Sequence, residues 1–125
     1  MIGGWAYNRY AEPRTTGDID FFLSTSKENE EKIRKVLSLF GFKDALPSKD
    51  RSIFEKKVIM LGRPPHRIDL ISEIDGITFE EAWKNHEKGK LDGLDVKFIS
   101  KNDLIKNKES TERTKDKLDV ENLSK

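Results

Sequence analysis

The chain has 125 residues with 24 Lys and Arg against 23 Asp and Glu, a length that fits one domain over residues 1–125 and a charge balance that argues against a general nucleic-acid-binding surface. Because it contains no Cys, disulfides, thiolate metal sites and a cysteine nucleophile are excluded. No apolar run approaches the ~20 residues needed to cross a bilayer, so we expect a cytoplasmic protein without a membrane segment.

The first clear alternation of hydrophobic and polar residues covers residues 18–23 and predicts a strand. The hydrophobic residues of this segment would face one side. Asp18 and Asp20 would share the other side, about 6–7 Å apart at the ~3.3 Å rise of a strand. The segment therefore predicts a strand that presents two carboxylates together.

An amphipathic helix is expected after this strand. Thr25 and Glu28 match a capping box, in which the first residue caps a helical N–H and the second reaches back to it. Apolar residues then recur at helical spacing as far as Phe40, and Gly41 suits the C-terminal end.

Two further strands are expected to form an antiparallel hairpin. Residues 52–61 predict the first, although charged residues in the middle blur the alternation, and residues 62–65 form a turn rich in Gly and Pro. Residues 67–72 predict the second. Asp69 stands inside this otherwise apolar strand, where an unpaired charge would be costly without a cation nearby.

The last third of the chain predicts shorter elements. Thr78–Glu81 and Ser100–Asp103 are further capping-box patterns, before helices over residues 78–88 and 100–106. Residues 91–99 are expected to be a short strand or loop, and the charged tail ends in a helix. Together the elements predict an α/β (α+β) fold with a small mixed β-sheet and helices packed mainly on one face.

The acidic residues of the two strands form a candidate metal site. Mg²⁺ at nucleotide sites is typically held by one or two carboxylates plus substrate phosphates, so Asp18, Asp20 and a third carboxylate from Asp69 suit it. Gly3 and Gly4 would let the backbone approach phosphates closely, and a helix beginning near Trp5 would direct its free N–H groups at them.

These residues carry a resemblance to a known family. The pattern is similar to the minimal nucleotidyltransferases of the polymerase-beta superfamily, in particular the stand-alone domains related to abortive-infection toxin nucleotidyltransferases. The likeness extends over nearly the whole chain. The matching segments are residues 3–6, 13–20, 67–70, 74–83, 98–108 and 113–119.

The resemblance implies a role for particular residues. Gly3, Gly4, Asp18, Asp20 and Asp69 would form the nucleotide and metal site. It also implies that the basic residues of the C-terminal segment return near the cleft and touch triphosphate, with Asp116 beside them. These basic residues are Lys108, Arg113 and Lys115.

Arg14 and Thr16 directly precede the first acidic strand. From there they could add phosphate contacts near the metals, because a guanidinium fork matches phosphate oxygens. For Arg14, a surface salt bridge is the alternative.

The implied activity is metal-dependent transfer of an NMP group from an NTP, such as ATP, to an acceptor hydroxyl, with release of pyrophosphate. Two Mg²⁺ ions are expected, with Mn²⁺ as an alternative, and Asp69 could accept the proton of the acceptor. The acceptor stays open among tRNA, a protein hydroxyl and a small molecule. The alternative is a catalytically inactive nucleotide-binding or protein-interaction module, such as a toxin–antitoxin component with a partner antitoxin.

The sequence also departs from the family pattern. Relatives usually carry a helix and a strand before the Gly pair, whereas this sequence starts at Met1, so either the start is truncated or the sheet lacks one element. Trp5 and Trp83 are expected to pack rather than to stack on bases. His66 and His86 are expected to be ordinary surface residues and not zinc ligands.

Overall fold

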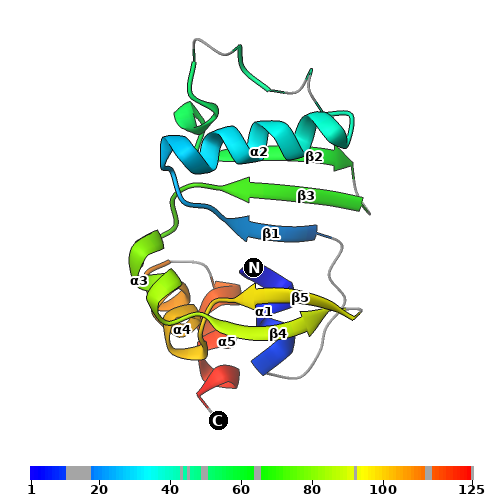
Figure 1. The fold of residues 1–125 in the computed structure, drawn as a ribbon. Helices are drawn as coiled ribbons and strands as arrows, with labels where there is room; N and C mark the ends of the chain where they lie inside the picture. Colours follow the sequence, from blue (N-terminus) through cyan, green and yellow to red (C-terminus); the bar gives the residue numbers. More distant parts are fainter. Residues whose placement is uncertain are drawn as a thin grey trace.

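The fold is taken from a computed structural model that describes residues 1–10, 18–42, 44, 46–48, 51–63, 66–91, 93–111 and 114–124, without the side chains of Trp5, His66, Thr114 and Lys115. The predicted α+β class is confirmed (Figure 1). The elements in chain order are α1 (Gly3–Tyr10), β1 (Asp18–Phe22), α2 (Lys27–Leu39), the 3₁₀ helix η2 (Ile53–Glu55), β2 (Val58–Arg63), β3 (His66–Ile71), α3 (Phe79–Lys84), β4 (Glu87–Leu91), β5 (Leu94–Phe98), α4 (Lys101–Glu109) and α5 (Thr114–Leu123).

A small mixed sheet has the strand order β1-β3-β2. The predicted hairpin is confirmed, because β2 and β3 pair antiparallel. β1 pairs with β3 in parallel, with Asp18 opposite Arg67 and Asp20 opposite Asp69. Since directly paired residues point to the same side of a sheet, this register places the acidic residues of both strands on one face.

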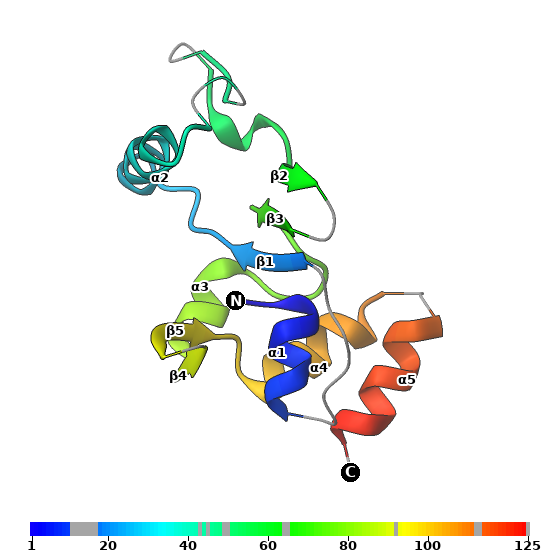
Figure 2. The same ribbon diagram turned by 90° about the vertical axis from the view of Figure 1, so that its right-hand side faces the viewer.

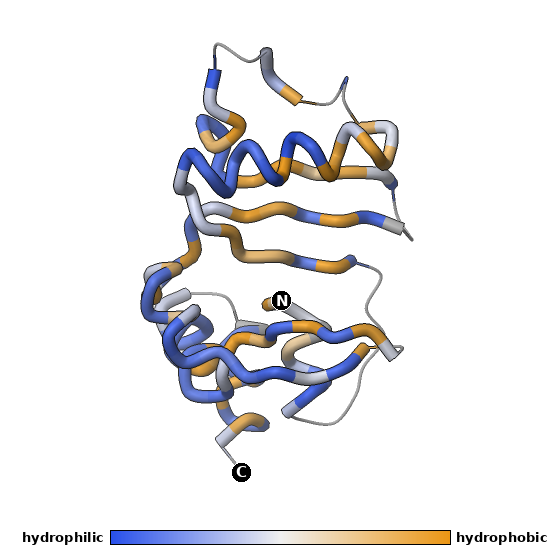
Figure 3. Tube along the Cα trace, viewed as in Figure 1, coloured by the Kyte–Doolittle hydropathy of each residue, from blue (hydrophilic) through white to orange (hydrophobic). Residues whose placement is uncertain are grey.

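Helix α2 covers the other face of this sheet (Figure 2). Leu37 of α2 packs with Leu61 and Leu70 in a buried cluster, and Phe21 of β1 and the following Leu23 pack against it. In Figure 3 the strands alternate in hydropathy, whereas α2 is mainly hydrophilic and becomes hydrophobic towards its C-terminal half. The helix is therefore fixed to the sheet mainly through its second half.

A second layer lies below β1 and contains α1, α4, α5 and the β4–β5 hairpin (Figures 1 and 2). Its core contains residues of α1, β5, α4 and α5, and Phe22 and Ile71 of the three-stranded sheet pack against it. The buried members are Ile2, Ala6, Tyr7, Phe98, Ile99, Leu104 and Leu123.

The first two residues connect the two layers. The backbone N–H of Ile2 donates to the carbonyl of Asp20 at 2.9 Å, and Met1 accepts from the N–H of Ile99 at 3.1 Å. The N-terminal amine of Met1 also donates to the carbonyl of Lys97 at 2.6 Å. Met1 and Ile2 thus lie as a short extended segment between β1 and the end of β5. This position places the start of α1 beside Asp20 in space.

Several boundaries differ from those expected. α2 is capped by Ser26 rather than Thr25, because the Ser26 hydroxyl accepts from the N–H of Asn29 at 3.2 Å. The strand expected from residue 52 begins only at Val58. Ser52 instead caps the 3₁₀ helix η2, and the N–H of Ile53 donates to Glu30 at 2.7 Å, so these backbone groups are satisfied outside the sheet.

The region after Thr78 also differs in part. Thr78 and Ser100 cap their helices as predicted, accepting from Glu81 and Asp103. However, the helix expected to reach residue 88 ends at Lys84, and residues 87–91 form β4, which pairs antiparallel with β5. Within the part of the chain that the structure describes, no helix is both long and apolar enough to cross a membrane.

Candidate functional site

The structure brings Asp18, Asp20 and Asp69 together on one face of the three-stranded sheet. Asp18 and Asp20 are alternate residues of β1, and Asp69 is the direct partner of Asp20 on β3. Neighbouring strands lie about 4.8 Å apart, so the Asp20 and Asp69 carboxylates are adjacent. The site therefore depends on the parallel pairing of two strands that are remote in sequence.

Arg67 lies among these carboxylates. Its Nη2 atom donates to Oδ2 of Asp18 at 2.8 Å and to Oδ2 of Asp69 at 3.1 Å. Its Nε atom lies 3.0 Å from Oδ1 of Asp69, an ion-pair distance whose angle does not satisfy a hydrogen bond. The hydrogen bond to Asp69 raises the pKa of Arg67 further above its already high ordinary value, so the guanidinium stays charged.

Arg67 is a site residue that the sequence pattern alone did not predict. A signal was present, because Arg67 and Asp69 are two residues apart in a predicted strand and therefore share one face. What the sequence does not show is the register with β1, which places Asp18 opposite Arg67.

The carboxylates experience an unfavourable environment. The pKa of Asp20 is raised from 3.8 to about 6, mainly by burial and then by the neighbouring Asp69 and Asp18, while Arg67 opposes the shift. Asp69 is only 7% exposed. Among the described residues, Oδ1 of Asp20 and Oδ1 of Asp69 are buried without a hydrogen-bond donor. Three carboxylates thus face one guanidinium, with two oxygens left unsatisfied.

Gly3 lies against the Asp20 carboxylate at the start of α1. Its φ of +67° is a left-handed conformation that favours glycine. A Cβ atom at this position would overlap Oδ2 of Asp20 and lie 3.0 Å from its Cγ. Gly4, the next residue, is half-buried in the first turn of α1. The helix N-terminus therefore begins beside the carboxylates, where its free N–H groups favour negative charge.

The donor set of this site suits a hard divalent cation. Carboxylate oxygens are the ligands that Mg²⁺ prefers, and the buried, unsatisfied oxygens of Asp20 and Asp69 are acceptors that a cation would satisfy. In the present side-chain positions, however, no group of three or more His, Cys, Asp or Glu residues in the described ranges is arranged to hold a metal ion. Arg67 lies within ion-pair distance of Oδ2 of Asp18 and of Oδ1 of Asp69.

The further residues expected to contact phosphate do not support that expectation: one is buried in an ion cluster, and the side chains of the others are not described by the structure. Lys108 is buried between α4 and α5, where its ammonium lies 3.2 Å from Asp116 and 2.7 Å from Asp119. A contact with triphosphate would require it to leave both carboxylates. The remaining residues, Arg14, Thr16, Arg113 and the side chain of Lys115, lie outside the described residues.

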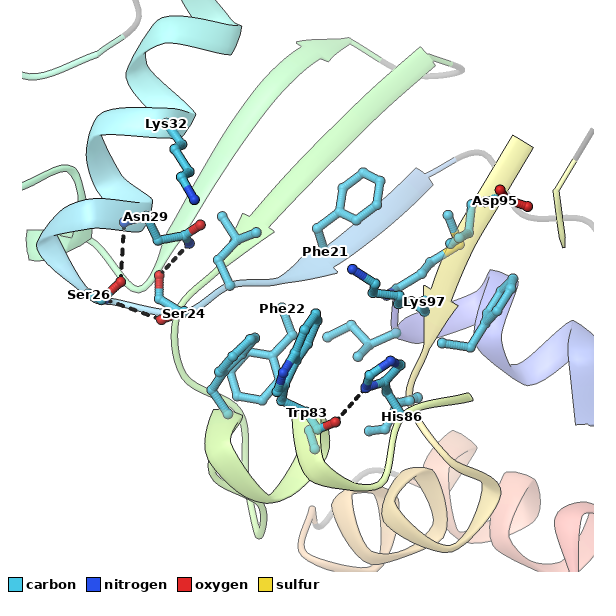
Figure 4. Close-up of a pocket in the computed structure, with 18 of the residues that line it drawn as sticks. Phe21, Phe22, Ser24, Ser26, Asn29, Lys32, Trp83, His86, Asp95 and Lys97 are labelled. Atoms are coloured by element: carbon cyan, nitrogen blue, oxygen red, sulfur yellow. Dashed lines mark hydrogen bonds between the residues drawn. The ribbon is translucent and has the colours of Figure 1, made fainter. Parts of the chain in front are cut away.

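A pocket of about 960 Å³ opens beside the N-terminal segment, between α2 and β1 on one side and α3 and β5 on the other (Figure 4). Phe21 and Phe22 of β1 line it. Trp83 also lines it, with its ring stacked on Phe79 at 5.9 Å and on His86 at 4.5 Å between centroids. The pocket includes Ile2 and Phe21, the chain neighbours of Gly3 and Asp20, so it adjoins the carboxylate site without containing it.

No protein-family model matches this chain, and no curated protein matches it significantly. Membership of the polymerase-beta superfamily therefore stays a prediction.

Proposed function

We propose that this chain is a metal-dependent nucleotidyltransferase that transfers an NMP group from an NTP to an acceptor hydroxyl and releases pyrophosphate. The observation that supports this best is the pairing of Asp20 with Asp69 across β1 and β3, with Asp18 on the same face and Gly3 against Asp20. A helix N-terminus beside paired carboxylates joins a phosphate-binding element to hard cation ligands.

Each element has a role in the proposed reaction. Asp18, Asp20 and Asp69 hold divalent cations, Mg²⁺ or Mn²⁺, which when bound neutralise charge on the triphosphate and align the attacking and leaving oxygens. The backbone N–H groups at Gly3 and Gly4 hold phosphate oxygens. The Asp69 carboxylate accepts the proton of the attacking hydroxyl. The acceptor is tRNA, a protein hydroxyl or a small molecule, and the cytoplasm is the proposed compartment.

A second candidate is favoured by a specific observation. Because Arg67 already forms ion pairs with Asp18 and Asp69, the site also fits a module that keeps the scaffold without turnover. Such a module would bind a nucleotide or a partner protein, for example an antitoxin. The two candidates differ in whether a nucleotide is transferred.

The test is incubation with each α-labelled NTP, Mg²⁺ or Mn²⁺, and cell extract as the source of acceptor. Wild type should give labelled product and pyrophosphate, and Asp18→Ala should lower the rate at least about 100-fold, since removing a group that stabilises transition-state charge typically has this effect. Asp75→Asn is the matched control, because Asp75 is exposed in a turn. Equal rates in all three proteins would overturn the proposal, and nucleotide binding without product would favour the module.

A further inference from the structure

We propose that Arg67 is the internal counter-cation of the carboxylate cluster and that it competes with a divalent cation for Asp18 and Asp69. This inference rests on the proposed function, because it assumes that the cluster binds metal ions. It adds a residue that controls how tightly they bind.

The geometry places a positive charge where a shared cation would lie. The Nη2 atom bridges carboxylates from two strands, at 2.8 Å from Asp18 and 3.1 Å from Asp69. A cation shared by these two residues needs the same oxygens. One guanidinium cannot satisfy three carboxylates, and Oδ1 of Asp20 accordingly has no hydrogen-bond donor among the described residues. Arg67 thus stabilises the cluster only in part.

Arg67 is also placed so that it can leave. Its side chain is 28% exposed, and its partner on β2 is Gly62, which offers no side chain to hold the guanidinium in place. Arginine has several rotatable bonds, so its guanidinium can turn without movement of the backbone. Moving the guanidinium towards solvent would free oxygens of Asp18 and Asp69 while the strands stay paired.

Two possible roles of Arg67, competing with the metal ion or holding the carboxylates in place for it, predict opposite changes in metal affinity. If Arg67 competes, removing its charge leaves the carboxylates more negative and strengthens metal binding. If Arg67 instead holds the carboxylates in the geometry that a metal needs, removing it weakens metal binding. The sign of the change in affinity therefore decides between them.

The experiment measures Mn²⁺ binding to the full chain without nucleotide, from the electron paramagnetic resonance signal of free Mn²⁺. Arg67→Gln should bind Mn²⁺ about tenfold or more tightly than wild type, the size expected for losing one charge-assisted contact. Arg63→Gln is the matched control, because it removes the same charge from an exposed residue on the opposite face of the sheet. It should bind like wild type.

A second readout covers the case in which Arg67→Gln folds poorly. Without metal this variant should have a lower Tm than Arg63→Gln, and Mn²⁺ should raise its Tm by more than that of wild type. Arg67→Lys keeps a charge but cannot bridge as a fork, so its affinity should fall between wild type and Arg67→Gln.

Unchanged or weaker Mn²⁺ binding in Arg67→Gln, or no Mn²⁺ binding in any variant, would overturn the inference. Failure of the proposed function is read separately, as the absence of labelled product from wild type. Tighter Mn²⁺ binding in Arg67→Gln would support the competition even if wild type transferred no nucleotide.

Discussion

Asp20 and Asp69 are direct partners across the parallel pairing of β1 and β3. Their carboxylates lie side by side and partly out of water, and burial together with this neighbouring charge raises the pKa of Asp20 to about 6. Two ionised carboxylates in this position destabilise the metal-free protein. The same arrangement supplies the oxygen donors that the proposed activity needs, so stability and function make opposite demands on Asp20.

Replacing Asp20 with Asn should therefore stabilise the metal-free protein at neutral pH. The pKa of Asp20 rises from 3.8 in the unfolded chain to about 6 in the folded protein. Between these values the folded state holds a proton that the unfolded state has lost, so the Asp20 contribution to the unfolding free energy falls as pH rises through this window. Guanidinium unfolding with a chelator should show Asp20→Asn more stable than wild type at pH 7.5.

The pH dependence separates this effect from a general gain in packing. Below about pH 4 both proteins carry a neutral group at this position, so the difference in unfolding free energy should largely vanish. The exposed control Asp75→Asn should show no such pH-dependent gain. An Asp20→Asn protein that is less stable than wild type at pH 7.5 would contradict the proposed repulsion.

Local patterns made much of this fold predictable. The alternation around Asp18 and Asp20, the hairpin that carries Asp69, and the capping residues Thr78 and Ser100 depend on neighbours within a few positions. The contact of Arg67 with Asp18 was not predictable in this way, because it depends on the register between β1 and β3, which α2, η2 and β2 separate in the chain. Periodicity fixes which face a residue takes but not which residue lies opposite.

In the C-terminal segment, too, the local sequence pattern did not predict which side chains contact one another. A Lys in a charged stretch is most often exposed, and the resemblance suggested phosphate contact for Lys108. The packing of α4 against α5 instead buries it with Asp116 and Asp119. The resemblance implied that Lys108 and Asp116 lie near one another, but their burial together with Asp119 depends on the packing of the two helices.

Gly3→Ala tests the close approach of α1 to Asp20. Gly3 and Gly41 both have left-handed φ values, +67° and +83°, so an Ala at either position should cost about 1–2 kcal/mol of backbone strain. Only at Gly3 would the Cβ atom overlap the Asp20 carboxylate, whereas at Gly41 nothing lies within 4 Å of it. The unfolding free energy of Gly3→Ala should therefore fall by about 1–3 kcal/mol more, the usual cost of overpacking.

The same variant should also lose nucleotide transfer, because the Asp20 carboxylate must move away from its partners. Gly41→Ala lies at the end of α2 and should keep the wild-type rate. Equal losses of stability in the two variants would show that Gly3 is needed only for its backbone conformation.

Lys108→Met should reduce stability strongly. Lys108 is buried, and its ammonium contacts Asp116 and Asp119. Removing one member of a buried ion cluster leaves the others without compensation, which typically costs about 3–5 kcal/mol. Thermal or denaturant unfolding should show this loss, whereas Lys117→Met, at an exposed position of α5, should stay close to wild type. Wild-type stability combined with a raised KM for the NTP would instead favour the phosphate contact.

The pocket beside Met1 and Ile2 predicts the effect of an added segment. These two residues are hydrogen-bonded to both β1 and β5. At this point the two strands are therefore separated by the width of one extended chain. The pocket continues from there between residues 21–24 and 94–98. Among the described strands, β3 is the one partner of β1 and β4 the one partner of β5. A short extension before Met1 with alternating Val and Thr should pair with both edges, since β-branched residues favour strands.

Such an extension would bury apolar side chains against Phe21 and Val96, which line the pocket. A net gain of only about 1 kcal/mol would raise the Tm by about 4 °C in a chain of this size. A Gly-Ser extension of equal length is the control, because it can occupy the same position but buries little apolar surface and loses more backbone entropy on ordering. If both extensions gave the same Tm, the edges of β1 and β5 would not accept a strand between them.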